Sequence, residues 1–373
     1  MFHVIVLGVG GMGGAAAAEL ARRGRRVLGL EQFAVGHDRG SSHGSTRVIR
    51  TAYYEHPDYV PLARRAFQRW HELEQRTGTH LVTKCQCLSI GRPDGELITG
   101  VRRAADQHAL AIETLAPADM RKRYPQFRFD DSYVGVLEHE AGFVYVDDCV
   151  GAFAADAKAH GATIREGEPV IGWEASAHGV TVRTHQATYT ADRLVIAAGG
   201  WATRLLGPWG RQLSVMRQVV FWLRPRDLSE FARDRFPVYL ADVPGGPFYG
   251  IPAIDPRGHK LARHYGAPDL RHPDEVDRIV TDADEAPVRE FVRRHLPGAD
   301  GERCDASVCI YTLSPDRHFV IDLHPEHSNV AVATGFSGHG FKFAPAVGEM
   351  LADLVEIGKT QLPGELFRFQ RLN

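Results

Sequence analysis

Apolar and polar positions at the start of the chain predict a strand, a turn, a helix and a second strand. Residues 4–7 are all apolar, which is typical of a strand buried on both faces of a parallel sheet. The glycine-rich run 8–13 follows directly, and the alanine-rich segment 15–21 has strong helix propensity. Gly24 ends this helix, and residues 26–30 predict the second strand. The chain therefore begins with an α/β unit built around a glycine turn.

This turn has the spacing of a dinucleotide-binding fingerprint. Gly8 makes a tight turn, Gly10 lets the backbone approach a pyrophosphate, and Gly13 lets helix and strand pack closely. The following helix directs unpaired N–H groups and its positive dipole end at the phosphates. Glu31, 23 residues after Gly8, ends the second strand, where a carboxylate accepts hydrogen bonds from ribose hydroxyls. The pattern predicts a Rossmann-type domain whose cofactor contacts are Gly8, Gly10, Gly11, Met12, Gly13 and Glu31.

Short strands in the middle of the chain favour FAD over NAD as the cofactor. Residues 170–174, 180–183 and 187–189 predict a small meander, and residues 194–198 predict a further buried strand. In many FAD-binding folds such a meander closes over the adenine half of the cofactor, and NAD dehydrogenases do not need it. We expect the end of the buried strand to contact FAD through Ala198, Gly199 and Trp201.

The remaining pattern predicts a second domain. Longer alternating strands between residues 213 and 263 indicate an antiparallel sheet, and residues 58–77, 286–295 and 345–358 predict helices. The fold class is therefore α/β, with a Rossmann-type FAD-binding domain and an antiparallel-sheet substrate domain. We assign residues 1–80, 141–212 and 305–373 to the FAD-binding domain, and residues 81–140 and 213–304 to the substrate domain.

Composition and charge narrow the class of protein. A chain of 373 residues with 44% hydrophobic and 24% charged residues is typical of a globular protein with two connected domains. The net charge of −2 predicts no steering toward nucleic acid or a membrane surface. Five cysteines in so long a chain do not resemble a secreted disulfide framework. The apolar N-terminal run is needed by the fingerprint, so we expect no signal peptide. No apolar stretch approaches membrane-spanning length, so we expect a cytoplasmic protein.

Residue patterns alone leave the chemistry open. Arg47 and Arg50 follow the cofactor-binding unit, where cations can meet flavin or substrate anions, although both could be solvated. Cys85 and Cys87 share a predicted strand face, but no further Cys/His cluster completes a metal site, so we expect no metal. Cys309 lies in an apolar strand, a pattern typical of a buried thiol.

The chain resembles the family of monomeric sarcosine oxidase and N-methyltryptophan oxidase, flavoenzymes with a glutathione-reductase-like and D-amino-acid-oxidase-like fold. The resemblance runs nearly end to end, through the fingerprint, residues 46–50, the Cys309 strand, residues 322–329 and the glycine-rich loop 335–343. It implies FAD bound covalently through its 8α-methyl group to Cys309. It also implies that Arg47 favours the thiolate and that His43 and Thr46 lie near the flavin ring.

The resemblance assigns further roles by position. Arg50 and Lys342 clamp the substrate carboxylate, since Arg binds a carboxylate bidentately and Lys adds a compact charge. Lys260 is the cation near flavin N5 where oxygen is reduced. Tyr249 and His264 line the amine and its N-methyl group, Tyr311 closes the pocket, Leu240 lines it, and Gly338 and Gly340 contact the cofactor. From spacing alone, Lys260 and Lys342 could instead be solvated or salt-bridged. Tyr249 could serve packing, and His264 could be a hydrogen-bonded core histidine.

The implied reaction is oxidation of a neutral secondary amino acid of the sarcosine type. The resulting imine hydrolyses to the amino acid and formaldehyde, and O2 is reduced to hydrogen peroxide. Bulkier N-methyl amino acids such as N-methyltryptophan, and cyclic ones such as pipecolate or proline, remain alternatives. So do an FAD- or NAD-linked dehydrogenase with another electron acceptor and a flavin-binding protein without catalysis. A monomer that acts on a small molecule is the family expectation.

Overall fold

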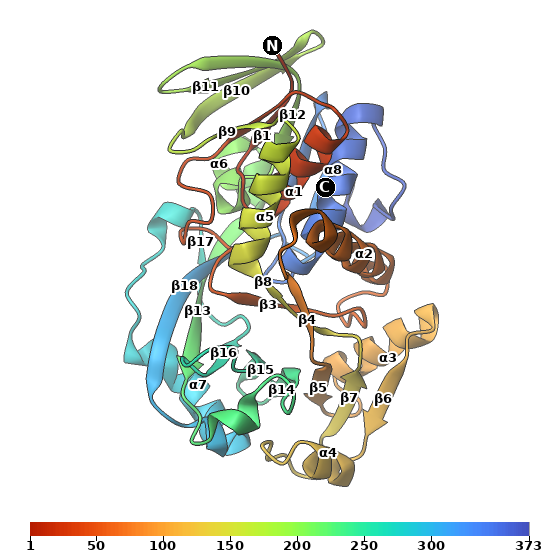
Figure 1. The fold of residues 1–373 in the computed structure, drawn as a ribbon, viewed down its shortest axis with the longest axis vertical. Coiled ribbons are helices and arrows are strands. Elements are labelled where there is room, and N and C mark those ends of the chain that lie inside the picture. Colours follow the sequence, from red (N-terminus) through yellow and green to blue (C-terminus); the bar gives the residue numbers. More distant parts are fainter. Residues whose placement is uncertain (373) are drawn as a thin grey trace.

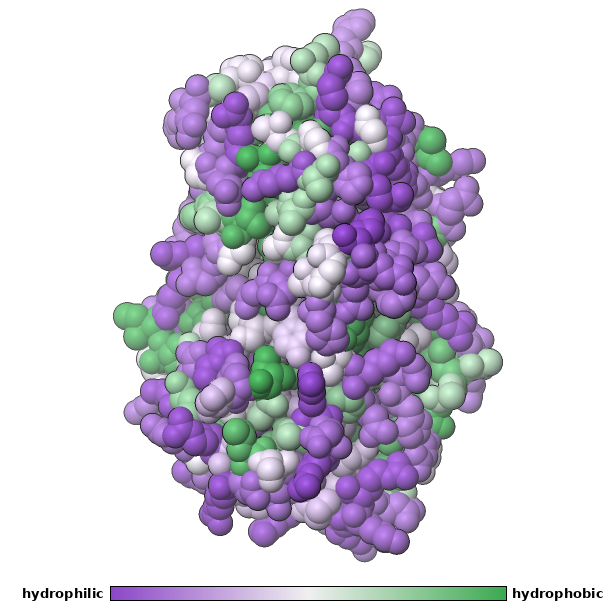
Figure 2. All heavy atoms as spheres, in the orientation of Figure 1, coloured by the Kyte–Doolittle hydropathy of each residue, from purple (hydrophilic) through white to green (hydrophobic). Residues whose placement is uncertain are grey.

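A computed structural model describes residues 1–372 as an α/β molecule with two large sheets and one small sheet. Figure 1 shows the two large sheets at opposite ends of the molecule, with β3, β4 and β8 between them. Among the described helices, none combines the length and apolar character that a membrane crossing requires. Figure 2 shows a mostly hydrophilic face on which hydrophobic residues are scattered.

The first sheet is built on the N-terminal unit that the sequence predicts. Its strand order is β10-β11-β12-β1-β2-β9, with β20 beside β12 and β19 beside β20. Strands β1, β2, β9, β12 and β20 are parallel neighbours, and the β10, β11, β12 meander and the β19–β20 hairpin are antiparallel. The strands are β1 (Phe2–Leu7), β2 (Val27–Leu30), β9 (Thr163–Arg165), β10 (Val170–Ser176), β11 (Gly179–Thr184), β12 (Thr188–Ile196), β19 (Val320–His324) and β20 (His327–Thr334).

Long helices cover one face of this sheet, and the short helix α6 (Ala202–Leu205) packs with residues of the other face. Helix α1 (Gly11–Arg22) packs against α5 (Val146–Ala159) and α8 (Ala344–Ile357), and α2 (Tyr59–Thr77) packs against α5 and α8. Small side chains allow this close approach: a Cβ added to Gly348 of α8 would lie 2.6 Å from a backbone atom of Ala15. The glycine turn is therefore held between β1 and a tight helical layer.

The second sheet has the order β17-β13-β16-β15-β14-β5-β7-β6, with β18 also paired to β13. All its pairings are antiparallel except β14 with β5. Its strands are β5 (Cys87–Gly91), β6 (Ile112–Leu115), β7 (Val134–Glu138), β13 (Ser214–Leu223), β14 (Val238–Val243), β15 (Gly246–Ile251), β16 (His259–Arg263), β17 (Asp269–Leu270) and β18 (Arg303–Leu313). The helices in this half are α3 (Glu96–His108), α4 (Pro117–Arg123) and α7 (Asp282–His295), and the small sheet pairs β8 (Gly142–Tyr145) with β3 (Thr46–Ile49) and β4 (Val82–Lys84).

Three features differ from the sequence prediction. Residues 188–196 form one strand, β12, which pairs with β11 near its start and with β1 and β20 toward its end. Strand β18 belongs to the second sheet along its whole length, although the sequence places residues 305–313 with the FAD-binding domain. Cys85 precedes β5, and Gln86 has φ 71°, so the two thiols do not share a strand face.

Candidate active site

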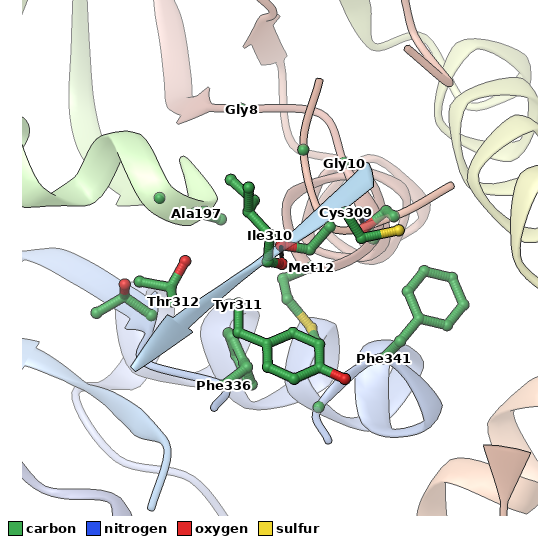
Figure 3. A pocket seen from close by; sticks show the side chains of 18 of the residues that line it. Gly8, Gly10, Met12, Ala197, Cys309, Ile310, Tyr311, Thr312, Phe336 and Phe341 are labelled. Atoms are coloured by element: carbon green, nitrogen blue, oxygen red, sulfur yellow. Dashed lines mark hydrogen bonds between the residues drawn. The ribbon is translucent and has the colours of Figure 1, made fainter. Parts of the chain in front are cut away.

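One cavity runs from the glycine turn after β1 to the loop before α8. Its wall combines the N-terminal unit, β3, the second sheet and the C-terminal loop. Figure 3 shows the β18 residues Cys309 and Tyr311 crossing between Gly8 and Gly10 on one side and Phe336 and Phe341 on the other. The predicted residues on this wall are Gly8, Gly10, Gly11, Met12, Glu31, Arg47, Arg50, Ala198, Gly199, Trp201, Leu240, Tyr249, His264, Cys309, Tyr311, Gly338, Gly340 and Lys342.

The glycine turn leaves backbone open where a pyrophosphate needs it. Gly8 has φ 82°, and a Cβ on Gly13 would lie 1.8 Å from the carbonyl oxygen of Gly8, so these two positions admit only glycine. A Cβ on Gly10 would meet no atom closer than 3.8 Å, and the first turn of α1 carries no acidic residue. This end of the cavity therefore fits the phosphates of FAD. Gly13 itself packs behind the wall and does not line the cavity.

Glu31 is placed to accept hydrogen bonds at the tip of β2. Its carboxylate accepts from the backbone N–H of Val9 at 2.9 Å and of Phe33 at 3.1 Å, and His37 lies 3.4 Å away. Burial raises the pKa of Glu31, but these contacts, first that of His37, outweigh burial and lower it. Glu31 is therefore an anion on the cavity wall, as a ribose-binding carboxylate must be.

Cys309 is a buried thiol beside a buried cation. Its Sγ accepts from Arg47 Nη2 at 3.5 Å and lies 4.0 Å from His43 Nδ1. Burial raises the pKa of Cys309, but the charge of Arg47 and the contact with His43 lower it to about 6. The lowered pKa favours the thiolate, which is the form in which a cysteine acts as a nucleophile.

Lys260, His43 and Thr46 do not line the cavity; they lie next to Arg47 and Cys309, which do. The Lys260 ammonium donates to the carbonyl oxygens of Gly44 at 2.6 Å and Thr46 at 2.7 Å. Its acceptors are uncharged oxygens, so burial, followed by the charge of Arg47, lowers the pKa of Lys260 well below its usual range. Negative charge that develops nearby would favour the charged form of this lysine.

Arg50 and Lys342 meet around one tyrosine at the far end of the same cavity. Lys342 Nζ donates to the hydroxyl of Tyr53 at 3.2 Å, and the Arg50 guanidinium lies 4.0 Å from the centre of the Tyr53 ring. Burial and the charge of Arg50 lower the pKa of Lys342 to about 7. Two buried cations this close form a site for an anion.

Glu55 is part of this site and was missed by the sequence analysis. Its two carboxylate oxygens accept from Arg50 Nη2 at 2.8 and 2.7 Å. Burial raises the pKa of Glu55, but the Arg50 charge outweighs burial and lowers it. An acidic residue five positions after an arginine gives no recognisable pattern, so only the folded loop reveals the pair.

Aromatic side chains form the wall between the two ends. His264 Nδ1 lies 3.0 Å from the hydroxyl of Tyr311, and the Tyr249 ring meets His264 edge-on at 6.1 Å. Burial lowers the pKa of His264 to about 3, and burial raises the pKa of Tyr249 to about 12. All three groups are therefore uncharged at neutral pH. Gly338, at φ 83°, is required because a Cβ there would lie 2.5 Å from the Tyr311 ring.

The structure also gathers three possible metal ligands outside the cavity. His324, Glu326 and His327 lie together at the β19–β20 turn, although the sequence predicts no metal site. His324 Nδ1 already accepts from the backbone N–H of Glu326 at 3.2 Å, which occupies one of its two nitrogen atoms.

Comparison with known proteins places the chain in a family. Residues 3–354 match the model of the family described as FAD dependent oxidoreductase. The monomeric sarcosine oxidase of Streptomyces avermitilis is 41% identical over 100% of this chain and 98% of its own length. The N-methyl-L-tryptophan oxidase of Salmonella agona is 34% identical over 99% and 100%.

Solved structures confirm the predicted fold class. NikD, an unusual amino acid oxidase essential for nikkomycin biosynthesis, matches with a TM-score of 0.85 and 27% identity over 98% of this chain and 97% of its own. Glycine oxidase from Geobacillus kaustophilus matches with a TM-score of 0.82 and 22% identity over 98% of both chains, a likeness of fold. The resemblance inferred from the sequence is thus confirmed: the chain belongs to the FAD dependent oxidoreductase family and, within it, to the family of monomeric sarcosine oxidases and N-methyl-L-tryptophan oxidases, and it is an FAD-dependent amine oxidase.

Proposed function

We propose that the protein oxidises the N-methyl group of a small secondary amino acid of the sarcosine type. The observation that carries the proposal is the pairing of Arg50 and Lys342 at one end of a cavity whose other end fits FAD. Uncharged aromatic side chains and His264 line the cavity between these two ends. The cavity therefore has an anion site, a neutral middle and a cofactor end.

The carboxylate of the substrate would bind Arg50 and Lys342. Because Glu55 already occupies one guanidinium nitrogen of Arg50, an incoming carboxylate must share or replace that contact. Among the contacts of residues 1–372, Lys342 Nζ donates to the Tyr53 hydroxyl and the carbonyl oxygen of His339, which leaves one N–H for the ligand. Glu55 thus keeps the buried Arg50 charge paired before the substrate binds.

The middle of the cavity favours the free amine over the ammonium form. His264, Tyr249 and Tyr311 are buried and uncharged, and none of them is a carboxylate that could stabilise an ammonium ion. A neutral amine keeps the lone pair that oxidation requires. Bound FAD would take two electrons from the substrate and pass them to O2, giving hydrogen peroxide, while the imine product hydrolyses to the amino acid and formaldehyde.

Cys309 is our proposed attachment point for the flavin, through an 8α-S-cysteinyl bond. Its lowered pKa and its contact with Arg47 support this, because the thiolate is the attacking species. Lys260 is our proposed cation for oxygen reduction. Support for this role comes from its burial beside Arg47, with an ammonium that donates to uncharged oxygens of Gly44 and Thr46.

Two walls near the anion site favour a small substrate. Leu240 and Tyr54 both line the cavity, and both pack against the hydrophobic cluster that includes α3. A Cβ on Gly100 of α3 would lie 2.4 Å from the carbonyl oxygen of Tyr54, so the helix backs this wall directly. We therefore expect a lower kcat/KM with N-methyltryptophan, pipecolate and proline than with sarcosine. We also propose that the protein works as a monomer and uses no nucleic acid or membrane partner.

A substrate panel tests the proposal. Air-equilibrated enzyme is supplied in turn with sarcosine, N-methyl-L-tryptophan, L-pipecolate and L-proline, and hydrogen peroxide and formaldehyde are quantified. We expect sarcosine to give both products in equal amounts and the highest kcat/KM. A higher kcat/KM with N-methyl-L-tryptophan would overturn the size argument, and flavin turnover without peroxide would overturn the use of O2.

A further inference from the structure

Lys260 is held by a turn that is itself held by another cation. Gly44 and Ser45 have φ values of 85° and 69°, so two successive residues adopt the left-handed conformation before β3. This turn brings the carbonyl oxygens of Gly44 and Thr46 to the Lys260 ammonium at 2.6 and 2.7 Å. The conformation is unfavourable for serine, so contacts from outside must maintain it.

Ser45 receives those contacts from two other parts of the chain. At the start of α5, Asp147 accepts from the Ser45 N–H at 2.9 Å, and the N–H of Val146 donates to the Ser45 carbonyl at 2.9 Å. From the loop before β16, Arg257 Nη2 donates to the Ser45 hydroxyl at 2.8 Å. The structure describes three partners for Ser45. Asp147 and Val146 belong to α5, and Arg257 alone of these three comes from the half of the molecule that contains the second sheet.

Arg257 is fixed in place by its own partners. Its guanidinium contacts Asp255 at 2.6 Å and Asp305 at 3.1 Å, and lies 4.8 Å from the centre of the Trp222 ring. Lys260 Nζ lies 5.3 Å from the same ring centre. Trp222 on β13 is the cross-strand partner of both Lys260 on β16 and Asp305 on β18. Lys260 and the Asp305 partner of Arg257 therefore lie in one row across the sheet.

We propose that Arg257 is a positioning residue for Lys260, acting through Ser45 to fix the turn whose carbonyl oxygens hold the ammonium. The inference rests on the oxygen-reducing role proposed for Lys260. Arg257 does not line the cavity, so it contacts neither substrate nor flavin there. A residue that served only to pair with Asp255 and Asp305 would not need the fourth contact to Ser45. The expected consequence is confined to the reaction of the reduced enzyme with O2.

Two variants test this contact from its two sides. Arg257→Gln removes the charge and the Nη2 atom that donates to Ser45. Ser45→Ala removes only the acceptor hydroxyl and keeps the Cβ that the left-handed backbone must tolerate. Arg224→Gln is the matched control, because Arg224 lies nearby and pairs with exposed Glu302 at 3.2 Å. For each purified holoenzyme we would measure the rate of anaerobic reduction by sarcosine and the rate constant for reoxidation by O2.

We expect Arg257→Gln and Ser45→Ala each to lower the reoxidation rate constant by about threefold to tenfold, the range of one lost hydrogen bond. Anaerobic reduction should keep its wild-type rate in both, and the control should match wild type in both half-reactions. Reoxidation of the double variant should be no slower than that of the slower single variant, because both changes remove the same hydrogen bond. Reoxidation at the wild-type rate, or equal slowing of both half-reactions, would overturn the inference.

A reference variant separates this inference from the proposed function. Lys260→Met should slow reoxidation more than either positioning variant. If Lys260→Met reoxidises at the wild-type rate, the oxygen role of Lys260 fails and the inference fails with it. If Lys260→Met is slow and Ser45→Ala is not, only the inference about Arg257 is overturned. Because Ser45→Ala removes a single oxygen atom, it remains informative even where Arg257→Gln does not fold.

Discussion

The pH dependence of carboxylate binding follows from the state of Lys342. Burial and the charge of Arg50 lower its pKa to about 7 in the ligand-free protein. A bound carboxylate favours the charged form of the lysine, so its pKa rises when the ligand enters. Above pH 7 the neutral lysine must therefore take up a proton as the ligand binds. The apparent affinity for a carboxylate falls as the pH rises through 7.

The size of this effect can be worked out from the same value. With a pKa of about 7, the dissociation constant rises by about fivefold between pH 7 and pH 8 if only the protonated lysine binds. At higher pH the rise levels off at the affinity that Arg50 supplies alone, since arginine stays charged. Below pH 6 the dissociation constant should be constant, because Lys342 is protonated in both states.

The assay uses a carboxylic acid without an amine, so that only one group of the ligand site titrates. Propionate is titrated into the oxidised holoenzyme between pH 6 and pH 9, and binding is followed by the change in flavin absorbance. In Lys342→Met the dissociation constant should be higher at pH 6 and nearly independent of pH. A wild-type dissociation constant that does not change across pH 7, or a pH dependence that persists in Lys342→Met, would refute the role of Lys342.

Three further outcomes are expected. Glu55→Gln should tighten carboxylate binding by about tenfold, because it removes the negative competitor for Arg50, and an unchanged or weaker propionate affinity would contradict this. Cys309→Ser should release its flavin into the supernatant after acid precipitation, whereas wild type should keep its yellow colour in the pellet; wild-type flavin in the supernatant would exclude the covalent bond. Gly13→Ala should yield protein with little bound FAD and a lower unfolding temperature, because the added Cβ would lie 1.8 Å from the carbonyl oxygen of Gly8. A wild-type FAD content in this variant would contradict such close packing.

The features that local pattern encodes were predicted from the sequence. The strand, glycine turn and helix depend on residues that are neighbours in the chain, so apolar runs and glycine spacing predict α1 and the parallel pairing of β1 with β2. The end of α2 at Thr77 follows in the same way from Gly78, which takes the left-handed conformation. Such elements need no knowledge of distant contacts.

The parts of the site that depend on distant contacts were not predictable from pattern. Strand β18 pairs with β13 across 80 or more residues, and an apolar strand carries no mark of the sheet it will join. Glu55 becomes part of the anion site only because its loop folds back on Arg50. Lys260 does not line the cavity, and its ammonium donates to the carbonyl oxygens of Gly44 and Thr46, which spacing along the chain does not show. The resemblance to a family supplied Lys260 as a candidate but not Glu55, and the fold supplies the partners of both.

One measurement tests the central claim directly: sarcosine is added to the anaerobic holoenzyme while the visible absorbance of the flavin is recorded. If Arg50 and Lys342 hold the acid group of a small N-methyl amino acid beside the flavin, the yellow colour should bleach in wild type. It should bleach much more slowly in Lys342→Met at the same sarcosine concentration. Wild-type enzyme that stays yellow with sarcosine, or a Lys342→Met variant that bleaches as fast as wild type, would contradict the account.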